Sequence, residues 1–296
     1  MTGTAAASVA CALAAAVLFA AGSVAQHHAA TTTGPLLTTL IRSPRWWAGL
    51  LGDGGGYALQ VAALALGAIL VVQPLLVTSL LFALPMSAYL TGRWPTRTTW
   101  LLAAGLCTAL AVFLIVGNPT AGGGNPDDAR WSWPLAGALT VTAATAAIGA
   151  VARTPGARAL ALGAAGGTLF GVAAALTAHV ADLITRGVPT VLGSWQTWML
   201  CTTGLAGYYL QQRAFHAGPL TASLPALTVA EPLTAVALGI TALGEHLDTD
   251  GPHLILVLAA VGVLLATTVA LSRRSAADDA AVTPGTAPPP GNPTPE

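Results

Sequence analysis

The sequence predicts an all-α polytopic membrane protein with about nine transmembrane helices, or ten, arranged as an inverted repeat. Three observations predict this fold class: the composition, the length of the apolar blocks and an internal repeat. Hydrophobic residues make up 54% of the chain and charged residues 7%, whereas a soluble domain carries about 25% charged residues. Apolar blocks of about 18 residues or more can cross a bilayer as helices, and these blocks lack the polar–apolar alternation of barrel strands.

The apolar blocks predict nine spans, and the main uncertainty in the count is the stretch 31–45, which is short and polar. A tenth, short span there is the alternative to a surface element. The nine spans are expected near residues 7–27, 46–66, 69–91, 98–117, 132–151, 157–181, 195–214, 218–243 and 253–271.

The arginines predict the orientation in the bilayer. With nine spans, only Arg130 and Arg186 lie on one side, and the other side holds nine arginines. The side rich in basic residues is cytoplasmic, so we expect the C-terminus inside and the N-terminus outside. The eight tryptophans, Trp131 among them, fall near span ends, as in an interfacial aromatic belt. The nine arginines are Arg42, Arg45, Arg93, Arg97, Arg153, Arg158, Arg213, Arg273 and Arg274.

An internal repeat relates the two halves of the chain at an offset of 151 residues. Residues 56–76 and 207–227 align without a gap, and eight of the 21 positions match. The same offset aligns His28 with His179. The matched pairs are Gly56/Gly207, Tyr57/Tyr208, Leu59/Leu210, Gln60/Gln211, Ala63/Ala214, Gly67/Gly218, Pro74/Pro225 and Leu76/Leu227.

Five spans separate each matched pair, and because five is odd the two copies must insert in opposite orientations. Inverted repeats are the architecture of secondary transporters, which expose a central site to each side in turn. An old duplication that serves only stability is the alternative. The predicted units are a first repeat at 1–131 with spans 1–4, a connecting span at 132–151, a second repeat at 152–271 with spans 6–9, and a Pro-rich, disordered cytoplasmic tail at 272–296.

Glu231 is the strongest candidate for a binding residue because it lies in the middle of an apolar block. An ionisable group at that depth is costly and usually faces a cavity, where it binds protons, cations or substrate. A structural glutamate bonded to a neighbouring helix is the alternative. Asp53 lies beside Gly54, Gly55 and Gly56, which are expected to loosen the helix, and its carboxylate with freed carbonyls would suit a hard cation. If the span begins later, Asp53 is merely interfacial.

Other candidates occur as repeat pairs or as helix breakers. Gln60 and Gln211, with Tyr57 and Tyr208 one turn earlier, either line a central cavity or bond across helices. Pro74, Pro225 and Pro232 interrupt helices at the expected binding site, or kink them for packing only. His28 and His179 end spans 1 and 6, and they are candidate gate residues or ordinary interfacial histidines.

Parts of the second copy resemble the drug/metabolite transporter superfamily in its EamA-like branch. The resemblance rests on residues 207–211 (GYYLQ), 218–220 (GPL), 224–225 (LP), 231–233 (EPL) and 243–247 (LGEHL). The stretch from Arg45 to Pro74 also resembles the NIPA-like magnesium transporters of that superfamily. The resemblance implies ten spans with both ends cytoplasmic, and movement of a small solute across the cytoplasmic membrane.

The sequence excludes several other classes. It has no hydrolase, protease or nucleotide-binding motif, so we expect no enzyme, no ATP-driven transport and no cofactor. Its zero net charge gives no reason to expect nucleic-acid binding, and Cys11, Cys107 and Cys201 show no metal spacing. We expect membrane lipid and a small solute as partners, with a homodimer left open. The alternatives are a divalent-cation transporter with Asp53 and Glu231 as ligands, and a structural or sensor membrane protein.

Overall fold

The computed structural model describes residues 3–33, 43–92, 94–120, 122, 128–184, 186–218, 220–247 and 251–282, and nearly all of them are helical. Two short strands, β1 (Pro119–Thr120) and β2 (His246–Leu247), pair antiparallel. The helices are α1 (Gly3–Thr33), α3 (Pro44–Leu66), α4 (Ile69–Val77), α5 (Ser79–Thr91), α6 (Arg97–Gly117), α7 (Asp128–Val151), α8 (Pro155–Ile184), α9 (Val188–Gly193), α10 (Trp195–Ala217), α11 (Leu220–Thr241) and α12 (Gly251–Val282).

The protein is an all-α, multi-pass membrane protein, as the sequence predicts. Among the described residues, seven helical segments are long and apolar enough to cross a membrane. The helices α3 and α10, with 23 residues each, are at least as long as five of these seven but are not among them. Both carry polar side chains along their length, such as Gln60 in α3 and Gln211 in α10. The seven segments are Gly3–Ala25, Ile69–Leu90, Arg97–Gly117, Asp128–Val151, Pro155–Ile184, Ala222–Thr241 and Gly251–Leu271.

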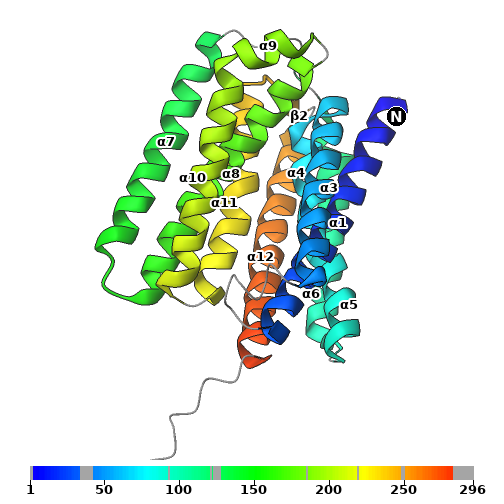
Figure 1. Cartoon of the computed structure of the whole chain (residues 1–296). Helices are drawn as coiled ribbons and strands as arrows, with labels where there is room; N and C mark the ends of the chain where they lie inside the picture. The colour runs from blue at the N-terminus through cyan, green and yellow to red at the C-terminus, as the bar shows by residue number, and fades with distance from the viewer. Residues whose placement is uncertain are drawn as a thin grey trace, which may run out of the picture.

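The helix α8 is the centre of the bundle, and most of its side chains are buried. It packs against α7, α10 and α11 and also touches α3, while α1 packs along α3, α4 and α5. The helix α12 closes the bundle against α6 and α11. The N-terminus lies at the same end of the bundle as α9 and β2, and the chain leaves α12 at the opposite end (Figure 1). The helix α1 therefore starts at the end that carries α9, whereas α8 runs toward that end, so the two helices point in opposite directions.

Glycines in α3 bring α1 and α3 together, and they do not loosen the helix as expected. The helix is continuous through Gly54, Gly55 and Gly56. A Cβ on Gly56 would lie 2.8 Å from the ring of Phe19, and one on Gly52 would lie 3.2 Å from the Cα of Gly22. Because each missing Cβ leaves room for α1, these glycines serve close packing.

The helix interruptions do not lie at the prolines that were predicted to cause them. The chain is extended at Gly67, between α3 and α4, and a second interruption at Thr78 separates α4 from α5. Pro74 lies inside α4, and Pro225 and Pro232 lie inside the continuous α11. Neighbouring helices and threonine hydroxyls can satisfy the carbonyls that proline frees, so a membrane helix tolerates these prolines.

The C-terminal segment is helical further than predicted. The helix α12 continues to Val282, although disorder was expected from residue 272. Residues 272–282 are rich in alanine, a strong helix former, and the first proline of the tail is Pro284. A helix usually ends before a proline, which explains where α12 stops.

Helix bounds and contacts recur at the offset of the sequence repeat. The first and last residues of α10 are the repeat equivalents of those of α3, and the last residue of α8 is the repeat equivalent of that of α1. A Cβ on Gly207 would lie 3.1 Å from the ring of Phe170, just as Gly56 lies against Phe19. The same offset relates these two contacts, so the pair α8–α10 packs like the pair α1–α3.

Candidate functional site

Glu231 lies in the middle of α11, at one of the three close contacts between this helix and α8. It is partly buried, and its backbone faces Gly171 of α8: a Cβ on that glycine would lie 2.5 Å from the Glu231 carbonyl oxygen. No side chain or backbone group among the described residues forms a hydrogen bond or ion pair with its carboxyl. A carboxyl in an apolar helix without such a partner is available to a proton, a cation or a polar solute.

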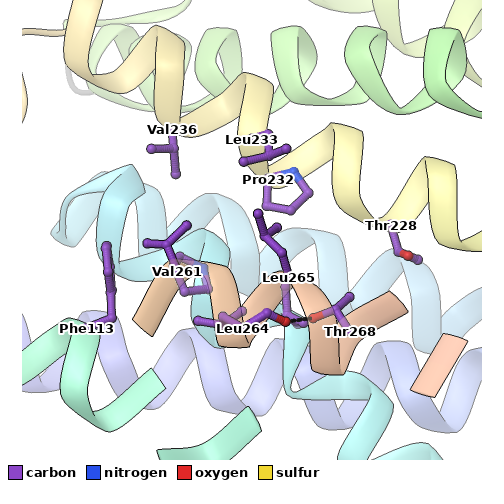
Figure 2. Close-up of a pocket in the computed structure, with 11 residues that line it drawn as sticks. Phe113, Thr228, Pro232, Leu233, Val236, Val261, Leu264, Leu265 and Thr268 are labelled. Carbon is purple, nitrogen blue, oxygen red and sulfur yellow. Dashed lines mark hydrogen bonds between the residues drawn. The ribbon is translucent and has the colours of Figure 1, made fainter. Parts of the chain in front are cut away.

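An apolar pocket opens beside Pro232, between α4, α6, α11 and α12 (Figure 2). It encloses about 520 Å³ of space between side chains, part of it open to the outside. The prolines Pro74 and Pro232 line it, the latter directly after Glu231 in sequence. The hydroxyls of Thr228 and Thr268 donate to carbonyls of their own helices, at 3.0 Å to Leu224 and 2.7 Å to Leu264. The pocket wall is therefore apolar in character.

The three candidates of α3 lie at helix contacts. Asp53 packs against α1, where its Oδ1 lies against Gly22 and leaves no room for a Cβ there. The Tyr57 hydroxyl and the Thr177 hydroxyl of α8 are 3.0 Å apart and share a hydrogen bond. Gln60 is buried, with 6% of its surface exposed. Tyr57 thus links the first half of the chain to α8.

The repeat partners on α10 have a different environment. Tyr208 is 58% exposed, and Gln211 is partly buried where α8 passes closely at Gly166. None of the six candidate binding residues is in the lining of the pocket beside Pro232. Among the described residues, no group of three histidine, cysteine, aspartate or glutamate side chains is arranged to hold a metal ion.

The gate candidate His179 is buried in an aromatic cluster at the end of α8. It is 4% exposed, and its ring lies edge-on to Trp131 at 5.6 Å between centroids. Trp195 contacts the other side of Trp131 at 6.4 Å. Trp131 is fully buried, so its assignment to an interfacial belt is wrong: here the indole fills the space between α7, α8 and α10. The side chain of His28 lies outside the described residues.

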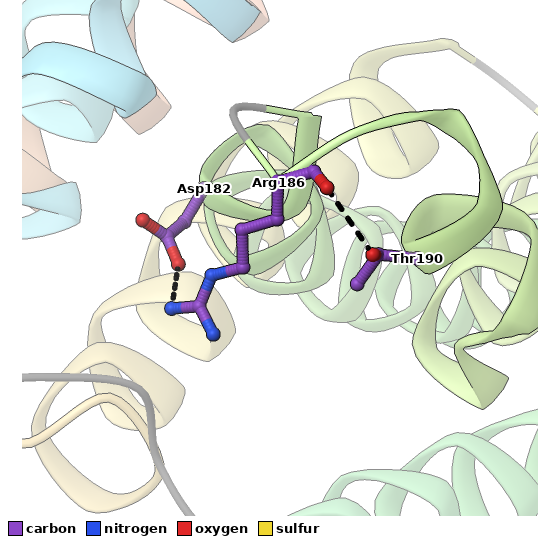
Figure 3. A network of polar contacts seen from close by, with 3 residues as sticks. All are labelled: Asp182, Arg186 and Thr190. Carbon is purple, nitrogen blue, oxygen red and sulfur yellow. Dashed lines mark hydrogen bonds and ion pairs between the residues drawn. The ribbon is translucent and has the colours of Figure 1, made fainter.

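Polar contacts surround this cluster. Asp128, at the start of α7, accepts hydrogen bonds from Trp195 Nε1 and Gln196 Nε2, both at 2.9 Å. Asp182 forms an exposed ion pair with Arg186 at 2.8 Å, and the Thr190 hydroxyl donates to the Arg186 carbonyl (Figure 3). The first two contacts join α7 to α10, and the others join the end of α8 to α9.

Glu245 is a site residue that the sequence reasoning missed, although it lies in the segment 243–247 that carries the family resemblance. Its carboxyl is buried and accepts hydrogen bonds from the backbone N–H groups of Ile69, at 2.6 Å, and Leu70, at 2.9 Å. Burial raises the pKa of the Glu245 carboxyl above its ordinary value, and the two N–H donors partly oppose this shift. The sequence signal that could have pointed to this contact is Gly67-Ala68: neither residue has a side chain that can cap the helix that follows.

Comparison with known proteins adds one relative. An uncharacterised protein of Corynebacterium glutamicum is 37% identical over 242 residues, which cover 81% of this chain and 83% of that protein. The chain belongs to the family of this corynebacterial protein. No family model matches the chain, and no solved structure matches it.

Proposed function

We propose that this protein is a secondary transporter of the drug/metabolite type, which moves a small solute across the cytoplasmic membrane by alternating access. One observation carries the proposal. Helix bounds and helix contacts of the first half recur in the second half at the offset of the sequence repeat, and the corresponding helices, such as α1 and α8, run in opposite directions (Figure 1). Two inverted halves can exchange conformations, and this exchange opens a central site to each side in turn.

The helix interruption in the first half supports the proposal. Irregular backbone within a membrane bundle is tolerated where protein or a cavity satisfies its polar groups, and such interruptions are typical of transporters. Here α4 is separated from α3 at Gly67 and from α5 at Thr78, and one of its residues, Pro74, lines the apolar pocket. Pro232, the residue after Glu231 in α11, also lines this pocket, and its apolar wall suits a solute with an apolar body.

The arginine distribution supports a cytoplasmic location for the end where the chain leaves α12. The turns at this end carry Arg97, Arg153, Arg158, Arg213 and Arg274, and Arg274 Nη1 is 3.4 Å from the Thr96 hydroxyl at the start of α6. Arg130 and Arg186 belong to the opposite end, with α9. By the positive-inside rule, α9 and β2 then face the outside, and nine crossings put the N-terminus outside as well.

The role of Glu231 can be tested in proteoliposomes with a panel of metabolites and cations, with and without a pH gradient. Wild-type protein is expected to drive uptake that depends on the gradient or on a counter-solute. Glu231→Gln should abolish this coupling, while Asp182→Asn, which changes an exposed carboxylate, should keep it. Coupled flux that is unchanged in Glu231→Gln would remove Glu231 from the mechanism.

The role of the pocket can be tested by filling it. Leu265→Trp places an indole against Pro232 in the pocket, whereas Leu258→Trp changes an outward-facing residue of the same helix, 61% exposed. We expect Leu265→Trp to lower flux by about tenfold or more at normal membrane expression, and Leu258→Trp to transport like the wild type. Equal flux in both variants would exclude this pocket from the solute path.

A further inference from the structure

Glu245 connects the second half of the chain to the first half at the end of the bundle that carries β1 and β2. Its carboxyl bonds to Ile69 N–H and Leu70 N–H, which open the helix α4. The first N–H groups of any helix have no carbonyl partner within it. The local N-cap residue is Ala68, whose side chain has no acceptor. Glu245 therefore supplies the cap that the sequence around α4 lacks, from 176 residues away.

The end of α11 directs Glu245 toward α4. Gly244 has a left-handed φ of 72°, and the N–H of Glu245 bonds back to the Gly239 carbonyl at 2.9 Å. A Cβ on Gly239 would lie 2.9 Å from Ile69 Cγ2 and 3.1 Å from Glu245 Oε2. Glycine at position 239 thus lets α11 approach α4 closely enough for the carboxyl to reach.

Two further contacts close the same end. The strand β1, after α6, pairs with β2, with Thr120 opposite His246. The guanidinium of Arg130, at the start of α7, lies beside Gly244, where a Cβ would be 2.8 Å from its Nη2. Connections from the first half, the connecting helix and the second half therefore meet around Glu245.

We propose that Glu245 is the latch of this end of the transporter: it holds α4 in the closed state and releases it when the end opens. The inference rests on the proposed function, because it assigns one step of that cycle to one contact. The contact suits a reversible role, since the carboxylate and the two N–H groups can each bond to water after separation. The two N–H groups, at the positive end of the α4 dipole, offset part of the cost of burying the carboxylate, and the contact holds the end closed without a covalent link.

A cross-strand disulfide tests whether this end opens. Antiparallel partner residues have Cα atoms about 4.5–5.5 Å apart, within the range that a disulfide spans. Thr120→Cys with His246→Cys would be made in the full chain after Cys11, Cys107 and Cys201 are replaced by alanine. We expect oxidation to reduce proteoliposome flux to the leak level and a reductant to restore it. The two single-cysteine variants, treated with the same oxidant, are the controls.

Substitution of Glu245 tests the latch itself, with the rate of disulfide formation in the same cysteine pair as the readout. Glu245→Ala should slow cross-linking by about tenfold, which corresponds to about 1.4 kcal/mol, because the closed end is less populated. Glu245→Gln keeps one acceptor oxygen and should fall between Glu245→Ala and the parent. Asp182→Ala, at an exposed carboxylate of the same end, should cross-link at the parent rate.

The outcomes separate the latch from the proposed function. If the oxidised pair transports as fast as the reduced pair, this end does not open and the latch is refuted, even when Glu245→Ala does not fold. If Glu245→Ala folds and cross-links at the parent rate, Glu245 does not hold the end closed. If the parent protein carries no solute in any panel, the proposed function fails, while the cross-linking rates still report on the contact.

Discussion

The two halves of the molecule differ in how closely their central helices pack. Along α8, Gly163, Gly167 and Gly171 face α11, and a Cβ on each would lie 2.5 Å from a backbone oxygen of Ser223, Leu227 or Glu231. At the repeat-equivalent positions, α1 carries Ala12, Ala16 and Ala20, which are at most 2% exposed. The second half therefore has a glycine contact between two continuous helices. The first half has buried alanines at the equivalent positions of α1, and its helix α4 ends at Thr78.

This difference indicates which half can move. Backbone-to-backbone contact along three turns leaves α8 and α11 little freedom to separate or slide, because any added atom must displace a main chain. In the first half, α4 is a short segment whose start depends on Glu245 and whose end is the break at Thr78. We infer that α8 and α11 form the fixed part of the molecule, and that α4 is the part whose position changes.

The largest expected effect is at the glycine contact. Gly167→Ala would place a methyl group 2.5 Å from the Leu227 carbonyl, and should destabilise the protein by about 2 kcal/mol or more. Ala16→Gly, at the matching position of α1, should cost about 1 kcal/mol through helix propensity. Thermal unfolding in detergent measures both. Gly137→Ala in α7, where nothing lies within 4 Å of the new Cβ, is the control, and equal losses at positions 167 and 137 would contradict the comparison.

The next effect is at the turn that directs Glu245. Gly244→Ala forces a φ of 72° on a residue with a Cβ and displaces Arg130, and should destabilise the protein by about 1–2 kcal/mol. Gly262→Ala in α12, which meets nothing within 4 Å, should leave stability unchanged or raise it slightly. The measurement is the unfolding midpoint of each variant, and a Gly244→Ala protein as stable as the parent would show that the turn does not need glycine.

A smaller effect is expected where α7 joins the second half. Asp128→Ala removes the acceptor of Trp195 Nε1 and Gln196 Nε2, and should cost about 1 kcal/mol. Asp182→Ala removes an exposed ion pair, and such pairs contribute roughly 0–1 kcal/mol. Denaturation curves of the two variants can be compared directly. If Asp182→Ala proves the more costly change, the contacts of Asp128 do not anchor α7.

The smallest effect is a pH dependence at Glu245. Because its folded pKa is raised, the folded protein binds this proton more tightly than the unfolded chain does, and stability should fall as pH rises from about 4.5 through the folded pKa. Glu245→Gln should remove this part of the slope. Unfolding midpoints of the parent and Glu245→Gln between about pH 4 and pH 8 measure it. Parallel curves for the two proteins would assign the slope to other groups.

The sequence predicted the helical membrane fold and the positions of most helices because long apolar blocks report bilayer spans directly. It misjudged details that depend on partners distant in the chain. Gly55 and Gly56 could not be assigned to packing without knowing that Leu18 and Phe19 face them, and Trp131 could not be assigned to the interior without His179 and Trp195. Spacing alone gives no sign that a loop glutamate caps a helix 176 residues away.

The candidate binding residues were predicted from side-chain type, and of the predicted helix-breaking prolines Pro74 and Pro232 line the pocket. Side-chain type did not distinguish residues that are packed between helices from residues that are exposed. Gln60 is buried while its repeat partner Gln211 is partly exposed, although the two positions are equivalent in sequence. Repeat symmetry predicts that two residues occupy equivalent positions in two helices. The neighbouring helices differ between the halves, and they determine whether each side chain is buried or exposed.

The most direct test of the central claim, that two inverted halves alternate, measures distances at both ends of the bundle in one preparation. Spin labels at Ala6→Cys and Val188→Cys report on the end with α9, and labels at Trp94→Cys and Val151→Cys report on the opposite end, all at exposed positions. On addition of a transported solute, we expect one distance to increase while the other decreases. Distances that stay fixed, or that change in the same direction, would contradict alternating access.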